Sequence, residues 1–304
     1  MNVIRLVPDP NPLLDQVFRL GESPLWDDRR ERLFFVDIDA GEIHHVTAEG
    51  GSHRMWYAPP PDRPTALGLT TAGRLVVALT RSVVILDPDS GTWEPLADID
   101  VGLSTTRLND GKVGPDGAFW VGSMDERSPE LREPIGALFR ITADGRVEKK
   151  LDGLVVANGL AWSPDGRTMW LADSRGPWID RFDFDPATGE MSNRSRFATP
   201  DEAMGRPDGC TCDAAGFYWS AGVSAGRLNR FAPDGRLVEF WDLPVAWPTM
   251  PCFGGEGLRH LFVTSLARPG VDQPASASLP AGSVITFPAQ IGGLPPRRFP
   301  DPRG

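Results

Sequence analysis

Three oxygen-bearing side chains occupy the same place in a pattern that returns along the chain. Glu22, Asn158 and Asp208 each precede a glycine or a tight turn by eight residues, and a large apolar residue by eleven or twelve. Two carboxylates and one amide are hard oxygen ligands, which suit Ca²⁺, Mg²⁺ or Mn²⁺ and can accept Zn²⁺ or Fe²⁺. If these side chains meet, the buried negative charge would be unfavourable alone, and a bound cation is the simplest compensation.

Three protein ligands would leave coordination positions for water and substrate, and an open site of this kind is typical of catalysis. The cation can polarise a carbonyl oxygen, and a neighbouring carboxylate can take the proton that an attacking water releases. The residue types therefore indicate hydrolysis. Arg107 and Asn109 stand at the equivalent place in another copy of the pattern. Because their side chains can hydrogen-bond a polyhydroxylated ligand, we expect them to hold substrate rather than metal.

The elements that must position these residues follow from the repeat itself. The pattern recurs every 40 to 50 residues, and its first position is mostly polar. The residues at this position are Glu22, Thr65, Asn109, Asn158, Asp208 and Thr249. A period of this size in a strand-rich chain is typical of propeller blades. We predict an all-β, six-bladed β-propeller with four-stranded antiparallel blades, a single domain over 1–304, in which these six positions converge on a central channel.

Short strand signals and tight turns run through the whole chain. Segments such as RLFFVDI, GRLVVAL and RTMWLAD are rich in β-branched and aromatic residues, as strands are. We expect the segment before Glu22 to supply the outer strand of the last blade, because closing the ring removes exposed sheet edges. The proline-rich stretches 59–64 and 294–302 predict an inter-blade loop and a terminal tail.

Charge and hydropathy exclude several classes of partner. The chain has 31 Lys and Arg against 41 Asp and Glu, a formal net charge of −10. Since phosphate binding needs clustered basic residues, we expect no nucleic-acid or acidic-membrane partner. No apolar run approaches the roughly 18 residues of a membrane span. The N-terminal residues also lack the apolar core of a signal peptide. We expect a cytoplasmic protein with a small-molecule ligand and no protein partner.

Other chemistry-bearing residues do not form convincing motifs. Cys210, Cys212 and Cys252 fit neither a disulfide framework nor a zinc pattern, so we expect free thiols. The string 222–226 matches the G-x-S-x-G nucleophile elbow, but a strand follows where an elbow needs a helix. There is no phosphate-cradling loop and no dinucleotide glycine fingerprint. Hydrolysis at the oxygen-ligand site remains the leading interpretation.

Five strings of the sequence resemble one known family. In chain order they are GESPLW, RLNDGKVGPDGAFWVGSM, ANGLAWSPDG, RPDGCTCDAAGFYWSA and CFGGEGLRHLFVTS. Block by block, over 21–299, they are similar to the SMP-30/gluconolactonase/luciferin-regenerating-enzyme family. The resemblance implies a six-bladed propeller and hydrolysis of sugar lactones. It also implies a divalent metal, with Ca²⁺ the leading ion, held by the residues matching Glu22, Asn158 and Asp208.

The resemblance implies roles for single residues as well. Asp208 would act both as a metal ligand and as the general base, and Arg107 and Asn109 would bind the sugar. Some members of the family place a substrate-contacting acid shortly after the segment that matches 122–124. Glu126 is the nearest candidate for that acid here, and an ungapped alignment puts Arg127 there instead.

Three hypotheses follow from the sequence. The leading one is a metal-dependent lactonase that opens an aldonolactone to its acid. A second is hydrolysis of phosphotriesters or similar esters at the same site, since fold and metal do not fix the substrate. A third is a non-catalytic calcium-binding or interaction propeller. The open ligand set and the pair Arg107 and Asn109 favour an enzyme, because a binding platform needs neither.

Overall fold

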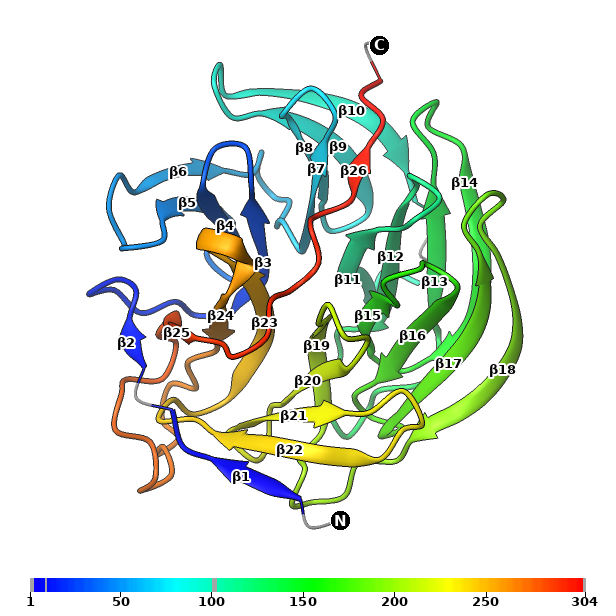
Figure 1. Ribbon diagram of the computed structural model, residues 1–304. Helices are drawn as coiled ribbons and strands as arrows, with labels where there is room; N and C mark the ends of the chain where they lie inside the picture. The colour runs from blue at the N-terminus through cyan, green and yellow to red at the C-terminus, as the bar shows by residue number, and fades with distance from the viewer. Residues whose placement is uncertain (1–2, 9, 100–102, 303–304) are drawn as a thin grey trace.

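A ring of six β-sheets forms the molecule (Figure 1). The computed structural model describes residues 3–8, 10–99 and 103–302. Within these ranges the only helical element is one 3-10 turn, η1 (Glu256–Leu258). No helix in the described ranges is long and apolar enough to cross a membrane. The sheets confirm the predicted all-β, six-bladed propeller with four-stranded antiparallel blades.

Each blade begins with a strand that lines the channel and continues outward through antiparallel hairpins. The inner strands are β3 (Gly21–Asp27), β7 (Ala66–Thr70), β11 (Thr106–Val113), β15 (Ala157–Trp162), β19 (Pro207–Cys212) and β23 (Pro248–Gly254). The outer strands are, in blade order, β4 (Arg32–Asp37), β5 (Glu42–Thr47) and β6 (Arg54–Tyr57); β8 (Leu75–Ala78), β9 (Ser82–Asp87) and β10 (Thr92–Asp98); β12 (Phe119–Asp125), β13 (Gly136–Ile141) and β14 (Val147–Leu154); β16 (Thr168–Asp173), β17 (Trp178–Asp185) and β18 (Glu190–Ala198); β20 (Tyr218–Gly222), β21 (Arg227–Phe231) and β22 (Leu237–Asp242); β24 (His260–Ser265) and β25 (Ile285–Pro288).

The N-terminal segment closes the ring. Strand β2 (Asn11–Pro12) pairs antiparallel with β25 and completes the sixth blade. The predicted closure by the segment before Glu22 is therefore confirmed. A second N-terminal strand, β1 (Ile4–Leu6), pairs in parallel with β22 and adds an outer strand to the fifth blade, as Figure 1 shows at its lower edge.

The repeated sequence pattern corresponds to the inner hairpin of each blade. Its turn lies between the first and second strands, and the glycines of two such turns, Gly117 and Gly216, have φ values of 77° and 83°. Glycine adopts this left-handed conformation without steric penalty. The large apolar residue falls on the second strand and is at most 2% exposed. These residues are Phe34, Val76, Trp120, Trp170, Trp219 and Leu261.

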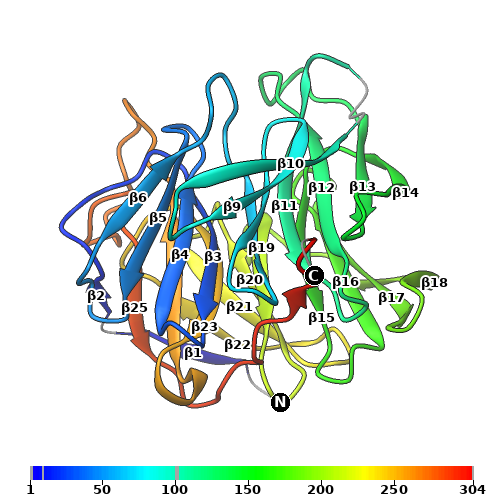
Figure 2. The ribbon, with the colours of Figure 1, turned by 90° about the horizontal axis from the view of Figure 1, so that it is seen from above.

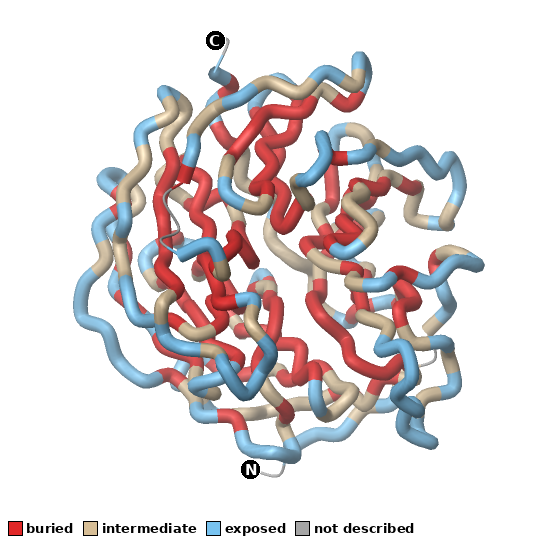
Figure 3. The backbone as a smooth tube through the Cα atoms, turned by 180° about the vertical axis from the view of Figure 1, so that it is seen from behind, coloured by how far each residue is buried: buried red, intermediate tan, exposed pale blue. Residues whose placement is uncertain are grey.

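Apolar side chains fill the gaps between blades. Six buried clusters occupy the six gaps between neighbouring sheets. For example, Trp120 of the third blade packs edge-on against Phe184 of the fourth, with ring centroids 5.5 Å apart. Figure 3 shows buried backbone gathered inside the ring and exposed loops around its rim. Close packing of this kind holds neighbouring sheets rigidly, so the inner strands keep fixed positions around the channel.

Residues 294–302, for which we predicted a terminal tail, form a strap across one end of the channel. Figure 1 shows this C-terminal strap crossing the centre of the ring, and Figure 2 gives the view turned by 90°. Its strand β26 (Arg298–Phe299) pairs in parallel with β7. Phe299 is fully buried, and Asp301 forms a buried ion pair with Arg74. The prediction of a tail was wrong because a two-residue strand carries no periodic sequence signal.

Candidate metal centre and substrate pocket

A β-bulge interrupts the inner strand beside the candidate residues in four blades. The breaks in pairing register lie between Glu22 and Leu25, Leu108 and Gly111, Asn158 and Ala161, and Pro207 and Cys210. A bulge bends the strand and re-aims its side chains. In the first blade the bulged residue Ser23 has φ 47°, and its hydroxyl oxygen accepts the Leu67 N–H at 2.9 Å. This bond to the second blade holds an otherwise strained conformation.

The carboxylates of Glu22 and Asp208 interact across the channel. Burial, and then the charge of Asp208, raise the pKa of Glu22 well above its usual range. Burial, and then the charge of Asp110, raise the pKa of Asp208 to about 7. Asp208 is only 9% exposed. Without a cation, the anionic forms of these groups are therefore destabilised by burial and by one another.

Asn158 is held in one orientation by Ser174 of its own blade, which in turn binds the neighbouring blade. Its Nδ2 donates to Ser174 Oγ at 2.8 Å, and the Ser174 hydroxyl donates to Pro207 O at 2.6 Å. Pro207 directly precedes Asp208. This link ties the amide of the fourth blade to the strand that carries Asp208 in the fifth, and it reserves the Oδ1 atom of Asn158 as an acceptor.

The surroundings of these groups fit a divalent cation. A fourth oxygen-bearing group, Asp110, has a buried Oδ1 with no hydrogen-bond partner among the described residues. Its Oδ2 accepts the Leu160 N–H at 3.1 Å. In the described part of the chain, no three His, Cys, Asp or Glu side chains are grouped to hold a metal. The candidate set instead takes its third oxygen from the amide of Asn158. Buried, oxygen-only and net negative, this environment matches the preference of a hard divalent cation.

Arg107 and Asn109 lie directly beside this set. Arg107 Nη1 donates to Asn109 Oδ1 at 2.7 Å and to Leu108 O at 2.8 Å. Asn109 Nδ2 donates to Asn158 Oδ1 at 3.2 Å and to Ala157 O at 2.8 Å. The expected substrate-binding pair is thus hydrogen-bonded to one of the expected metal ligands.

The structure places Glu126, rather than Arg127, next to this pair. Glu126 Oε1 accepts Arg107 Nε at 3.0 Å and Arg63 Nη2 at 2.5 Å. Arg127 instead forms ion pairs with Asp125 at 2.6 Å and Glu133 at 3.0 Å. Of the two alternatives that the sequence left open, only Glu126 is joined to Arg107.

Sequence reasoning missed Asp110 and Arg63. Asp110 follows Asn109 directly, and its charge acts on both Glu22 and Asp208. The sequence does offer a signal for Asp110, because it is an acid directly beside Asn109, which belongs to the repeated pattern. Arg63 lies in the proline-rich inter-blade loop, where nothing in the local sequence distinguishes it. At the repeat position of the sixth blade, Thr249 donates its hydroxyl to Gly21 O at 2.5 Å, so it ties that blade to the first.

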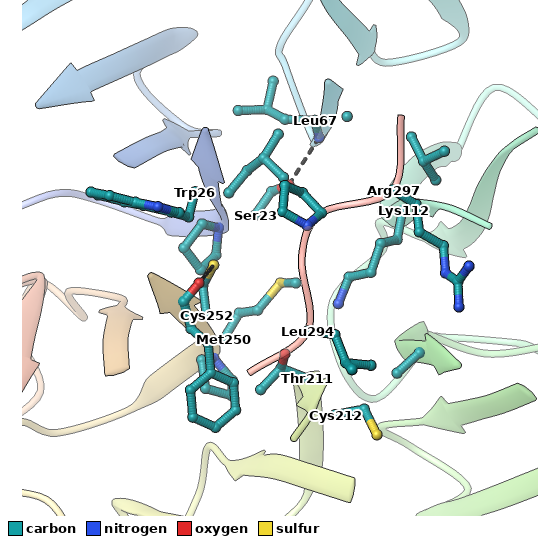
Figure 4. Close-up of a pocket in the computed structure, with 18 of the residues that line it drawn as sticks. Ser23, Trp26, Leu67, Lys112, Thr211, Cys212, Met250, Cys252, Leu294 and Arg297 are labelled. Atoms are coloured by element: carbon teal, nitrogen blue, oxygen red, sulfur yellow. Dashed lines mark hydrogen bonds between the residues drawn. The ribbon is translucent and has the colours of Figure 1, made fainter. Parts of the chain in front are cut away.

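Below these residues the channel continues as a mainly apolar cavity of about 110 Å³. Figure 4 shows Trp26, Lys112, Met250 and Cys252 lining it, with Leu294 of the C-terminal strap at its edge. Lys112 Nζ donates to Cys210 O at 2.9 Å. The strap lies across this end, so the mouth at the opposite end is the approach to the candidate site.

The cysteines near this cavity are free thiols, as predicted. Burial raises the pKa of Cys210 to about 12 and that of Cys252 to about 11. Because the thiolate is the reactive form, these groups are poor nucleophiles at neutral pH. We therefore expect no thiolate chemistry from Cys210 or Cys252 at neutral pH.

Comparison with known proteins places the chain in a family. A family model described as the SMP-30/Gluconolactonase/LRE-like region matches residues 20–267, a range that contains every candidate residue. The chain belongs to this family. The match confirms the resemblance on which the sequence analysis relied.

Individual proteins also match most of the chain. A 6-deoxy-6-sulfogluconolactonase from Pseudomonas putida is 37% identical over 248 residues, covering 81% of this chain and 83% of that protein. An L-arabinolactonase from Azospirillum brasilense is 34% identical over 296 residues, covering 96% of each. The solved structure of regucalcin, a calcium-binding protein from Agrobacterium tumefaciens, has a TM-score of 0.90 at 23% identity, covering 98% of this chain and 99% of that one. That likeness supports the fold.

Proposed function

We propose that this protein is a metal-dependent lactonase that opens a sugar lactone to its aldonic acid. Two neighbouring groups of residues carry the proposal. The oxygen-bearing set of Glu22, Asn158 and Asp208 is buried or half-buried. The pair Arg107 and Asn109 is joined to it by the hydrogen bond from Asn109 to Asn158, at 3.2 Å. Relatives named as lactonases of gluconolactone and arabinolactone type support the same reaction class.

Glu22, Asn158 and Asp208 would hold one divalent cation. Bound there, it would supply positive charge that polarises the lactone carbonyl and stabilises negative charge on its oxygen. Ca²⁺ is the leading ion for an all-oxygen set, and Zn²⁺, Mn²⁺, Mg²⁺ and Fe²⁺ are the alternatives to test.

The chain's own residues would bind the sugar and move the proton. Asp208 takes a proton from the water whose oxygen attacks the carbonyl carbon, and it returns that proton to the ring oxygen as the ring C–O bond breaks. Arg107 uses its Nε and Nη1 donors on Glu126, Asn109 and Leu108. A guanidinium carries five N–H donors, so the two on Nη2 remain for sugar hydroxyls.

An Asp208→Asn variant tests the proposal. The protein is stripped of metal with a chelator, and acid release from gluconolactone, arabinonolactone and xylonolactone is followed with each divalent ion added back. We expect metal-restored hydrolysis in the wild type and at least a roughly 100-fold loss in the variant, because the proposed base and one ligand charge are removed. The control is Asp165→Asn, in a turn at the far end of the fourth blade.

Three outcomes would count against this proposal. Near-full, metal-dependent activity in Asp208→Asn would remove Asp208 from the reaction. An aryl phosphotriester hydrolysed faster than every lactone would support the esterase alternative. Metal binding without hydrolysis of any substrate would support the non-catalytic propeller.

A further inference from the structure

Four arginines gather around the mouth of the channel. Inner strands begin at the mouth and neighbouring strands alternate in direction, so the loops after the second and fourth strands of a blade return to this end. The four arginines lie in the loops β12–β13, β16–β17, β18–β19 and β24–β25. They are Arg132, Arg175, Arg206 and Arg268.

These arginines are not held in ion pairs, although the charges of Asp125 and Glu126 act on Arg132 and that of Asp208 acts on Arg206. None of the four forms an ion pair with a residue in the described ranges. Arg132 Nε donates to a backbone oxygen, Arg127 O, at 3.0 Å, and the Arg268 guanidinium lies 5.0 Å from the centre of the Trp247 ring. Burial, and then the charge of Arg175, lower the pKa of both Arg132 and Arg206. The charge of Arg175 therefore acts on both Arg132 and Arg206, and the charge of Arg268 acts on Arg206.

Several other arginines of this molecule are matched by acids, although some single ones, such as Arg167 and Arg181, also form no ion pair within the described ranges. Three that lie against the blades each pair with a fully or largely buried aspartate. These pairs are Arg74–Asp301, Arg140–Asp116 and Arg230–Asp213. In a chain with a net charge of −10, carboxylates are not scarce. An unmatched positive cluster at the mouth of an acidic protein indicates that a ligand supplies the negative charge.

The cluster stands beside the candidate reaction centre. Arg206 is half-buried, precedes Asp208 by two residues, and attracts the Asp208 carboxylate. Arg175 follows Ser174, whose hydroxyl accepts Asn158 Nδ2. Because all four arginines lie in loops at the mouth, the part of a bound sugar nearest the mouth would meet them when its carbonyl lies at Asp208. Glu130 is exposed near Arg175, and it forms no ion pair in the described ranges.

We propose that the substrate is a sugar lactone with an anionic substituent remote from its carbonyl, bound by Arg206, Arg175 and Arg268. The inference rests on the proposed lactonase function and adds the substrate class. Phosphate, sulfonate and carboxylate share the required chemistry, since each offers oxygen acceptors that the planar arginine fork can bind in pairs. The unmatched charges would also speed the approach of an anion at low ionic strength.

The test compares charged and neutral lactones on the metal-loaded protein. The neutral substrate is glucono-1,5-lactone; the charged ones carry a 6-phosphate, a 6-sulfonate or a 6-carboxylate, and these three distinguish the sources of the anion. We expect kcat/KM at least roughly tenfold higher for one charged lactone, with a preference that weakens as salt rises. Arg206→Gln and Arg175→Gln should each reduce that preference several-fold. Arg167→Gln, which removes the same charge at the far end of the fourth blade, should not.

A binding measurement separates this inference from the proposed function. The unreactive 1,5-anhydroglucitol 6-phosphate is titrated against 1,5-anhydroglucitol by calorimetry, and we expect the phosphate to bind at least roughly tenfold more tightly. Hydrolysis of neutral and charged lactones at equal rates, with equal binding of the two analogues, would overturn the anion site and leave the lactonase standing. Hydrolysis of none of the lactones would overturn the lactonase, while the titration would still decide the anion site.

Discussion

At the scale of single residues, the candidate site is a chain of hydrogen bonds. It runs from Arg63 in the inter-blade loop to Glu126 at 2.5 Å, on to Arg107 at 3.0 Å, to Asn109 at 2.7 Å and to Asn158 at 3.2 Å. Each member orients the next, so the position of Arg107 depends on the carboxylate behind it. We therefore propose that Glu126, expected from the sequence as a substrate-contacting acid, acts by positioning Arg107.

We predict that Glu126→Gln raises KM for a lactone about tenfold with a smaller change in kcat. The amide loses the charge that holds Arg63 and Arg107, and a charge-assisted hydrogen bond contributes roughly 1.5–3 kcal/mol. Steady-state kinetics with the metal-loaded protein measure the split. Arg127→Gln is the matched control, which should lower stability through the loss of its Asp125 pair and leave KM near the wild-type value. A larger KM in the control than in Glu126→Gln would contradict this assignment.

The sequence predicted part of this site and missed part for a geometric reason. Glu22, Asn158 and Asp208 share one position of a repeat, so a ring of blades places them at the same end of the channel. Asn109 and Asp110 are neighbours, and in a regular strand their side chains would face opposite ways. The bulge between Leu108 and Gly111 breaks that alternation. The sequence analysis did not predict this bulge.

At the scale of elements, β5 carries a buried histidine, His44, and a half-buried one, His45, away from the channel. The His44 ring nitrogens lie 3.0 Å from His53 Nε2 and 3.1 Å from Glu42 Oε2. His45 stacks on Trp56, with ring centroids 6.0 Å apart, and neither of its ring nitrogens has a hydrogen-bond partner in the described ranges. Burial lowers the pKa of both His44 and His45 to about 4.

The free energy of unfolding should fall as pH drops from about 6.5 toward 4. The unfolded chain takes up a proton at each of these histidines near pH 6.5, whereas the folded protein holds them neutral until about pH 4. The free energy of unfolding is therefore unaffected by these histidines above about pH 6.5, and it falls by roughly 2 kcal/mol as the pH drops toward 4. Urea unfolding at several pH values measures the slope. His45→Phe keeps the stacking and removes one titration, so an unchanged slope in that variant would contradict the prediction.

The sequence predicts some elements of the fold better than others. The inner hairpins carry a polar residue, a turn and a buried anchor in fixed order, and all six blades follow from that order. Strands β1 and β26 span three and two residues, and both pair in parallel with partners more than 200 positions away along the chain. Such pairing is decided by tertiary contacts, which local composition does not encode.

At the scale of the whole molecule, both terminal segments fasten the ring. Strand β2 completes the sixth blade, and the C-terminal strap adds β26 to the channel side of the second. Phe299 lies in the apolar cluster between the second and third blades, and its carbonyl oxygen accepts the Thr71 N–H at 2.9 Å. The strap therefore contributes to the core as well as covering the channel.

We predict that Phe299→Ala lowers the free energy of unfolding by about 3–4 kcal/mol, because a fully buried aromatic side chain leaves a cavity. Urea denaturation followed by tryptophan fluorescence measures the change. The exposed Pro302→Ala is the control in the same segment and should stay within about 0.5 kcal/mol of the wild type. A loss below about 1 kcal/mol in Phe299→Ala would show that the strap is dispensable for stability.

The strap across the far end of the channel also limits where ligands can enter and leave. A lactone would enter at the mouth, and the acid formed from it would leave by the same opening. The other end of the cavity is bordered by Leu294 and Arg297 (Figure 4). Under the proposed function, one molecule would have to leave before the next enters, and the new carboxylate of the acid would pass the arginines at the mouth. We therefore expect accumulated acid to compete with fresh lactone for this single opening, so that turnover would slow as the product builds up.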